Sequence, residues 1–563
     1  MKSEMLHERK EFLNHRDLIE WAAETYAGKT AYSFRTSLSA PKTKISFTQF
    51  RDDVRALTSR LAKMNVAGKK CVMIGGFSYS FALVYFSVII AGGILVPLDR
   101  DWQAAELAKT ARKADASFLF IDEELKEKAE AISSECSLEC EPVYISGYGS
   151  GEGLEAFIEE GRAIYERTPE IYASLDNGSL HTSLIVFTSG TTGEGKGVML
   201  NQRGILDDVS SVVPYVDFSD KTVGVLPLHH TYGSTVMLVG HIAIGSEVYI
   251  SQGLRYVQKE LREEKPGHLI LVPLYLETFY RKIMANVKEQ GKEKLLSRMI
   301  KISNFLLKLG IDLRKKLFSS VRAAFGGEVK MIISGGAPIN AEIIDFFSAV
   351  GISTLNGYGI TECSPIIAVN RTKRVVKGSV GSVLDINEVK IDSPNEAGEG
   401  EILVRGSNVM QGYYKNDEAT KAAFDSEGFF RTGDYGRLDG DILTITGRKK
   451  NLIILSNGKN VYPEEIENEL TATPGVLDII VYEGQSRRGL EHNAIVAEIY
   501  PDKDYIEKNS IRDIRAHISR YIEEYNKTAV PYKKIAVLKI RDEEFPKNTL
   551  RKIMRFKLDL TID

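Results

Sequence analysis

Residues 184–197 read LIVFTSGTTGEGKG, an apolar run of four residues followed at once by glycines, hydroxyl side chains and a lysine. The apolar run predicts a buried strand, and the glycines let the loop behind it curl so that several N–H groups face one anion. An ordinary surface turn would not gather four hydroxyls directly after a buried strand. The loop therefore predicts a phosphate site whose candidate residues are Thr188, Ser189, Gly190, Thr191, Thr192, Gly193 and Lys196.

The segment from Gly190 to Lys196 also satisfies G-x-x-x-x-G-K, the first seven positions of the P-loop of nucleoside triphosphatases. The eighth position of that motif is Ser or Thr, whose hydroxyl binds Mg²⁺, but here it is Gly197, which has no ligand atom. The metal ligand would have to come from another segment. A P-loop-type nucleotide-binding protein is therefore the less favoured alternative.

The 563 residues exceed one compact domain and suffice for a large core with a smaller partner domain. Hydrophobic residues make up 43% and charged residues 26%, and 73 basic against 76 acidic side chains leave a net charge of −3. This balance gives no reason to expect a nucleic-acid partner. The four cysteines lack the paired spacing of a disulfide framework or a zinc site, so we expect a cytoplasmic protein.

The N-terminal residues 1–17 are charged and contain no apolar run, so we expect no signal peptide. One stretch, residues 81–98, carries no charge and barely reaches the length of a membrane span. Gly92, Gly93 and Pro97 divide this stretch, which favours a buried helix followed by a strand over a transmembrane helix.

Short apolar runs alternate with helix-like stretches, at residues 71–74, 117–121, 184–187, 269–272 and 330–334. Such alternation predicts an α/β fold with stacked, largely buried sheets. In the region that holds residues 401–405 and 442–446, glycines separate shorter strands, which indicates a β-barrel-like unit. We expect a large N-terminal domain over residues 1–449 and a small α+β C-terminal domain over residues 450–563.

The segment 281–318 holds 11 basic side chains against three acidic ones. Apolar residues recur in it at helical spacing, in the stripe Leu295, Met299, Ile302, Leu306 and Leu309. The first hypothesis is a surface helix that packs this stripe on its own domain. The alternative is peripheral contact with an anionic membrane surface, where a lipid substrate would be collected.

The loop sequence TSGTTGEGKGV resembles the signature loop of the adenylate-forming superfamily, which includes acyl-CoA synthetases, firefly luciferases and the adenylation domains of peptide synthetases. Five further segments resemble motifs of that family and follow in the family's order. They are LPLHH at residues 226–230, GGAP at 335–338, NGYGITE at 356–362, RTGD at 431–434 and GRKK at 447–450. One such motif would be weak evidence, whereas six in order identify the superfamily.

The resemblance implies that a carboxylic acid reacts with ATP to give an acyl-adenylate and pyrophosphate, and that a thioester then forms on coenzyme A. Besides the loop, it implies ATP-binding roles for Gly336, Ala337, Asn356, Gly357, Tyr358, Gly359, Thr361, Asp434 and Arg448. Glu362 and Thr188 would bind Mg²⁺, and a carboxylate oxygen is a ligand that Mg²⁺ prefers.

Further roles follow from the same resemblance. His230 matches the gate residue of the substrate site, and Lys552 matches the lysine that serves adenylation and also binds ATP. Lys450 matches the hinge about which the small, mobile domain rotates. The rotation would form a pantetheine channel, which takes in Ser456, Asn457 and Gly458.

Two positions depart from the family pattern, since Gly195 stands where proline is usual and Arg551 where glycine is usual. No aspartate follows the gate motif to pair with an ammonium group, which disfavours an amino acid substrate. The amphipathic segment before Ser334 resembles an insertion of long-chain acyl-CoA synthetases, and it points to a medium- or long-chain fatty acid. Coenzyme A and an acyl carrier protein stay open as acceptors, because both present the same thiol arm.

Overall fold

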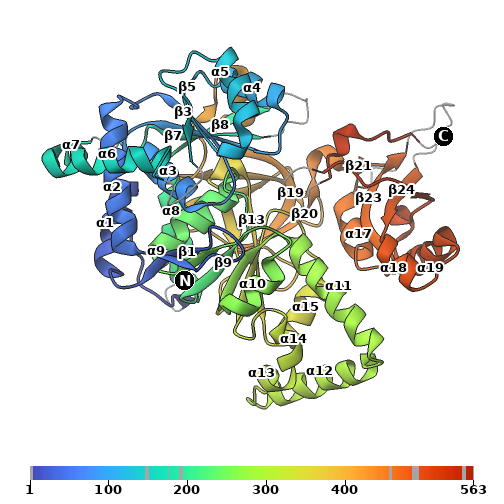
Figure 1. Ribbon diagram of the computed structural model, residues 1–563. Helices are drawn as coiled ribbons and strands as arrows, with labels where there is room; N and C mark the ends of the chain where they lie inside the picture. Colours follow the sequence, from blue (N-terminus) through green and yellow to red (C-terminus); the bar gives the residue numbers. More distant parts are fainter. Residues whose placement is uncertain are drawn as a thin grey trace.

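The structure is a computed structural model that describes residues 4–145, 151–175, 178–188, 195–455, 460–484, 494–547 and 553–561. Figure 1 shows a large body of sheets and helices and, to its right, a smaller lobe formed by the C-terminal part of the chain. Three sheets build the large body, and in the described residues the strands of the lobe pair only with one another.

A seven-stranded sheet carries the phosphate loop. Its order is β18-β8-β7-β4-β3-β5-β6, with β18 Gly412–Tyr413, β8 Lys196–Asn201, β7 Thr182–Thr188, β4 Ile94–Leu98, β3 Lys70–Ile74, β5 Ala116–Ile121 and β6 Val143–Tyr144. The central strands are parallel and β8 is antiparallel to β7. Every residue of α3 (Tyr79–Ile90) is buried, and β4 follows it, so the predicted helix and strand in residues 81–98 are confirmed.

A nine-stranded sheet joins parallel and antiparallel parts. Its order is β11 His268–Leu271, β12 Met331–Ser334, β13 Ser353–Gly359, β14 Ile366–Val369, β15 Gly381–Val383, β20 Ile442–Arg448, β19 Phe430–Asp439, β17 Gly400–Gly406 and β16 Asn387–Asp392. The first half of β13 pairs in parallel with β12, and its second half pairs antiparallel with β14. β13 therefore joins the two parts of the sheet. The parallel strands lie on one side of it, and the glycine-separated antiparallel strands lie on the other.

The third sheet has the order β2 Thr43–Ser46, β1 Thr30–Phe34, β10 Glu247–Ile250 and β9 Lys221–Gly224. The longer helices of the large body include α1 His15–Thr25, α2 Phe47–Lys63, α4 Ala104–Lys113, α5 Lys126–Glu135, α6 Leu154–Arg167, α8 Gln202–Val212, α10 Val257–Glu264 and α15 Ala341–Ala349. No helix in the described part of the chain combines the length and the apolar character needed to cross a membrane.

The C-terminal lobe is α+β. Its strands β23 Val476–Gly484, β24 Ala494–Pro501 and β25 Val537–Ile540 form a sheet beside α17 Pro463–Leu470, α18 Lys503–Lys508 and α19 Ile514–Thr528. The lobe meets α11 (Pro273–Glu289) of the large body through an ion pair between Lys508 and Glu289 and a contact of 3.9 Å between Arg281 and Asp502. The boundary at residues 449 and 450 stays a prediction.

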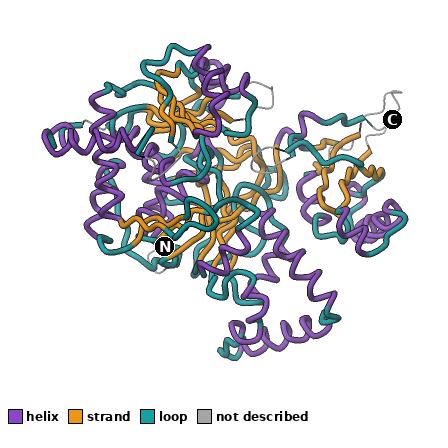
Figure 2. Tube along the Cα trace, viewed as in Figure 1, coloured by secondary structure: helices purple, strands orange, loops and turns teal. Residues whose placement is uncertain are grey.

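The basic segment 281–318 forms the end of α11, then α12 (Glu293–Lys308) and α13 (Arg314–Leu317), which project from the large body at the bottom of Figures 1 and 2. On α12, Leu296 and Ser303 are buried. Leu295, Ile302 and Leu309 are more than half exposed, so the expectation that their stripe packs on its own domain is wrong for these three residues. Apolar residues form two neighbouring stripes along α12. The stripe that packs on the large body is displaced by about one residue from the predicted stripe.

Candidate active site

The two strands that flank the phosphate loop form a hairpin, in which Thr188 of β7 is opposite Lys196 of β8. The Thr188 Oγ1 hydroxyl donates to the Lys196 carbonyl oxygen at 3.4 Å. Lys113 Nζ donates to the Gly195 carbonyl oxygen at 3.0 Å. Both ends of the loop are thus held, while the candidates Ser189, Gly190, Thr191, Thr192 and Gly193 lie outside the described residues.

Tyr413 connects the loop lysine to the candidate metal ligand. The Lys196 Nζ lies 4.7 Å from the centroid of the Tyr413 ring. The Tyr413 hydroxyl donates to Glu362 Oε1 at 3.0 Å. Glu362 lies in the short 3-10 turn Thr361–Cys363, where burial raises the pKa of its carboxyl group. The turn therefore brings a partly desolvated carboxylate to the end of the phosphate loop.

A second group joins three residues that lie far apart in the sequence. Asp434 of β19 is opposite Arg448 of β20, and Arg448 Nε lies 3.0 Å from Asp434 Oδ1. The Tyr358 hydroxyl donates to Asp434 Oδ2 at 2.7 Å. The attraction of Asp434 raises the pKa of the Arg448 guanidinium. Arg448 and Asp434 also act electrostatically on Glu362, so the two groups belong to one site.

The turn that carries Glu362 rests on a buried polar network that sequence reasoning missed. Asn408 Nδ2 donates to Asp208 Oδ1 at 2.8 Å, and the Ile366 N–H donates to Asp208 Oδ2 at the same distance. The Met410 N–H donates to the Glu362 carbonyl oxygen at 2.8 Å. Burial raises the pKa of Asp208 well above its usual value. None of these residues lies in a motif with a chemical signature, so only the fold brings them together.

The gate segment contains two neighbouring histidines, His229 and His230, whose ring centroids lie 4.4 Å apart. Burial lowers the pKa of His229 to about 4, so its ring is neutral at pH 7 and its 3.7 Å contact with Asp99 is no ion pair. A π-helix, η4 (Tyr232–Val239), follows directly, and π-helical turns are frequent at functional sites.

The π-helix contacts the turn of the GGAP motif, residues 335–338, two of whose residues have predicted ATP-binding roles. A Cβ on Gly335 would lie 3.2 Å from the Tyr232 ring, so the backbone of the turn approaches this ring closely. Gly336 has a φ of +85°, in the left-handed region that glycine adopts without strain, and Ala337 follows it. In β13, Gly359 packs where a Cβ would lie 1.9 Å from the Pro365 carbonyl oxygen.

Of the predicted hinge residue, adenylation lysine and channel residues, the structure describes only the hinge residue. Lys450 lies in the 3-10 turn Lys449–Asn451, directly after β20 and between the large body and the lobe. Lys552 lies outside the described residues, as do Ser456, Asn457 and Gly458. Their roles stay predictions from the sequence.

The residues present fit a magnesium ion that is bound together with a nucleotide. Among the described residues, no group of three or more His, Cys, Asp or Glu side chains could hold a metal ion alone. Mg²⁺ in nucleotide sites is commonly held by one or two carboxylates plus phosphate oxygens. Glu362 supplies one carboxylate, whose Oε1 accepts the hydrogen bond from Tyr413.

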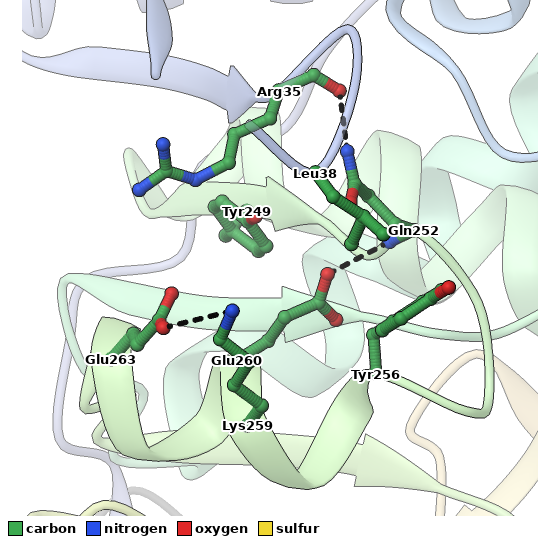
Figure 3. Close-up of a pocket in the computed structure, with 8 residues that line it drawn as sticks. All are labelled: Arg35, Leu38, Tyr249, Gln252, Tyr256, Lys259, Glu260 and Glu263. Atoms are coloured by element: carbon green, nitrogen blue, oxygen red, sulfur yellow. Dashed lines mark hydrogen bonds and ion pairs between the residues drawn. The ribbon is translucent and has the colours of Figure 1, made fainter. Parts of the chain in front are cut away.

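A small surface pocket of about 130 Å³ lies elsewhere, between the loop after β1 and helix α10 (Figure 3). Some of its polar groups are engaged with one another. The Gln252 N–H donates to Glu260 Oε1 at 3.0 Å, and Lys259 lies 3.6 Å from Glu263. No motif residue lines this pocket, so it is not the candidate site.

Comparison with known proteins agrees with the motifs. The family model described as AMP-binding enzyme matches residues 19–414. The chain is similar to the long-chain-fatty-acid–CoA ligase FadD15 of Mycobacterium bovis, with 28% identity over 464 residues, 78% of this chain and 75% of the relative. It is also similar to the chloroplastic long-chain-fatty-acid–[acyl-carrier-protein] ligase AEE15 of Arabidopsis thaliana, with 27% identity, 87% of this chain and 76% of the relative.

Among solved structures, ATP-bound MatB from Rhodopseudomonas palustris has a TM-score of 0.71 at 22% identity and covers 96% of this chain and 97% of its own. This likeness confirms the predicted α/β fold class with its large N-terminal and smaller C-terminal parts. The family match ends before Asp434 and Arg448, but the contact of Asp434 with Tyr358 ties them to the matched region. The chain therefore belongs to the family of AMP-binding enzymes, as its six motifs predicted, and is an adenylate-forming ligase.

Proposed function

We propose that the protein activates a medium- or long-chain fatty acid with ATP, as the acyl-adenylate, and transfers the acyl group to the thiol of coenzyme A. The observation that carries the proposal is the convergence of two groups from distant segments. Lys196, Tyr413 and Glu362 form one, and Asp434 with its partners Tyr358 and Arg448 forms the other. A P-loop ATPase would not need the second group.

The side chains suit a reaction that is limited by repulsion between anions. A carboxylate must approach a triphosphate, so the site has to supply positive charge and fixed geometry. Lys196 and Arg448 supply cations, and Asp434 offers acceptors for ribose hydroxyls. Mg²⁺, when bound, would neutralise phosphate charge, with Glu362 and Thr188 as its proposed ligands. Lys552 would stabilise charge at the α-phosphate by about 4 kcal/mol, at about 4 Å and an effective dielectric near 20.

Names of relatives and the sequence of the gate support the fatty acid. The bacterial and the plant relative are both ligases of long-chain fatty acids by name. Because the plant relative is named for an acyl carrier protein, a carrier-protein acceptor is the alternative to coenzyme A. Transfer would follow a rotation of the lobe at Lys450, with Ser456–Gly458 facing the thiol arm.

We further propose that α12 contacts an anionic membrane surface. Leu295, Ile302, Phe305 and Leu309 form one exposed apolar stripe on α12 and at its end. The neighbouring positions on that side are basic, namely Lys294, Arg298, Lys301 and Lys308. An exposed apolar stripe beside cations suits the interface of an anionic bilayer, where a fatty acid would dissolve.

Acid-dependent exchange of labelled pyrophosphate into ATP tests the adenylation. With a panel of carboxylic acids, we expect exchange with medium- or long-chain fatty acids and detection of the acyl-AMP by mass. Lys552→Ala should abolish exchange and leave the thermal unfolding transition in place. Release of phosphate instead of pyrophosphate would contradict the proposal. Offering coenzyme A and an acyl carrier protein to the acyl-adenylate separates the two acceptors.

A further inference from the structure

We propose that Tyr413 is a positioning residue that holds both the Glu362 carboxylate, the proposed metal ligand, and the Lys196 ammonium, the proposed phosphate-binding cation. The inference rests on the proposed roles of Glu362 and Lys196, and it adds to them a residue that lies in none of the six motifs. The observation behind the inference is that the side chain of Tyr413 contacts both Glu362 and Lys196.

The backbone of Tyr413 is fixed from both sides. β18 pairs with β8, so that Tyr413 is opposite Val198, two residues beyond Lys196. The Tyr413 N–H donates to Thr420 Oγ1 at 2.9 Å. Gly412 has a φ of +143°, and a Cβ there would lie 2.8 Å from Thr420 Cγ2. These contacts therefore fix the place from which the Tyr413 side chain leaves the backbone.

The two ends of the side chain do different work. A phenol is neutral at pH 7 and donates its one proton, and here Glu362 Oε1 receives it at 3.0 Å. A hydrogen bond to a carboxylate is a strong one and restricts how that group rotates. The Glu362 backbone is held as well, by the Met410 N–H. Glu362 is thus held at one carboxylate oxygen and at its backbone, in an orientation to which Tyr413 contributes.

The ring face acts on Lys196. Its Nζ lies 4.7 Å from the ring centroid, within the range of a cation–π contact. A lysine on a flexible stem loses rotamer freedom when it binds a phosphate, and a ring that holds it beforehand reduces this loss. The hydroxyl thus positions the proposed metal ligand Glu362, and the ring positions Lys196, the proposed phosphate-binding residue.

Two variants separate these functions. Tyr413→Phe keeps the ring and removes the hydroxyl, whereas Tyr413→Leu removes both. Calorimetric titration of the full chain with ATP, with and without Mg²⁺, provides a readout that does not depend on catalysis. For Tyr413→Phe we expect the Mg²⁺ concentration at half-saturation to rise about tenfold, with unchanged affinity for metal-free ATP. Tyr413→Leu should also bind metal-free ATP several-fold more weakly, about what loss of a cation–π contact allows.

The next residue provides a matched control. The Tyr414 hydroxyl donates to Asp115 Oδ2 at 2.6 Å, on an exposed surface away from Glu362. Tyr414→Phe should leave the Mg²⁺ dependence unchanged. If Tyr413→Phe has the Mg²⁺ dependence of the wild type, Tyr413 is not a positioning residue, while the proposed function stands. If the wild type itself shows no Mg²⁺-dependent binding of ATP, the proposed function and the role of Tyr413 both fail. Because Tyr413→Phe retains the buried ring, its result decides even if Tyr413→Leu does not fold.

Discussion

Asp434 shows how one buried side chain combines two tasks. It is 3% exposed, accepts the Tyr358 hydroxyl and pairs with the Arg448 guanidinium. The resemblance predicted ATP-binding roles for both Tyr358 and Asp434. Because the Tyr358 hydroxyl donates to the Asp434 carboxylate, the orientations of the Tyr358 ring and of this carboxylate depend on each other.

We expect Asp434→Asn to raise the KM for ATP by at least about tenfold, because the amide replaces one of the two acceptor oxygens by a donor and leaves Arg448 without its anion. The free energy of unfolding should fall by about 1–3 kcal/mol. Steady-state kinetics and urea unfolding measure the two effects. Tyr358→Phe is the control for the single lost hydrogen bond and should cost about 1 kcal/mol of stability. An unchanged KM in Asp434→Asn would remove this residue from the nucleotide site.

Helix α12 shows the limit of periodicity at the scale of one element. A spacing of three and four residues predicts an apolar stripe, but α12 has two neighbouring stripes. Leu296, Met299 and Ile300 face the protein, whereas Ile302 and Phe305 are exposed. Contacts with the large body determine which of the two stripes is buried, and these contacts cannot be read from the sequence of the helix.

The exposed stripe predicts binding to vesicles that contain anionic lipids. Co-sedimentation at low salt should capture the wild type and lose it as salt rises, because screening weakens the attraction of the basic residues. The double variant Ile302→Ser/Phe305→Ser should bind at least about tenfold more weakly. Leu180→Ser, at an exposed site outside the stripe, should bind like the wild type. If the wild type stays in the supernatant with anionic vesicles at low salt, α12 is no membrane contact.

On the scale of the whole molecule, several histidines are buried in the neutral form. Burial lowers the pKa of His15 and His241 to about 4 and that of His268 well below its usual value. His241 and His268 face each other, with their Nε2 atoms 3.0 Å apart. One ring can donate to the other only while at least one of these nitrogens carries no proton.

These shifts predict a loss of stability in mild acid. The histidines bind protons in the unfolded chain below about pH 6.5 but in the folded protein only near pH 4, so their contribution is present above pH 6.5 and is lost as the pH falls towards 4. At one pH unit below 6.5 each buried histidine should cost about 1.4 kcal/mol. Urea unfolding at pH 7.5 and 5.5 measures the difference. His15→Gln should reduce it by one histidine's share, and equal stability at both pH values would contradict the prediction.

The class of fold, the family and the type of chemistry could all be predicted from the amino-acid sequence. Buried parallel strands need apolar runs, and a phosphate loop needs glycines and donors, so both leave local patterns such as residues 184–197. The NGYGITE motif, which ends at Glu362, could be recognised in the sequence for the same reason. These features depend on a few consecutive residues, and their physical causes act within those residues.

The contacts between residues that lie far apart in the sequence could not be predicted and are seen in the fold alone. Tyr413 lies between Lys196 and Glu362 because a two-residue strand pairs with β8, and nothing in the local sequence around Tyr413 encodes that pairing. The Asp208 network and the packed face of α12 arise in the same way. Long-range contacts are set by the packing of whole elements, so a single sequence names the reacting groups but not the side chains that hold them.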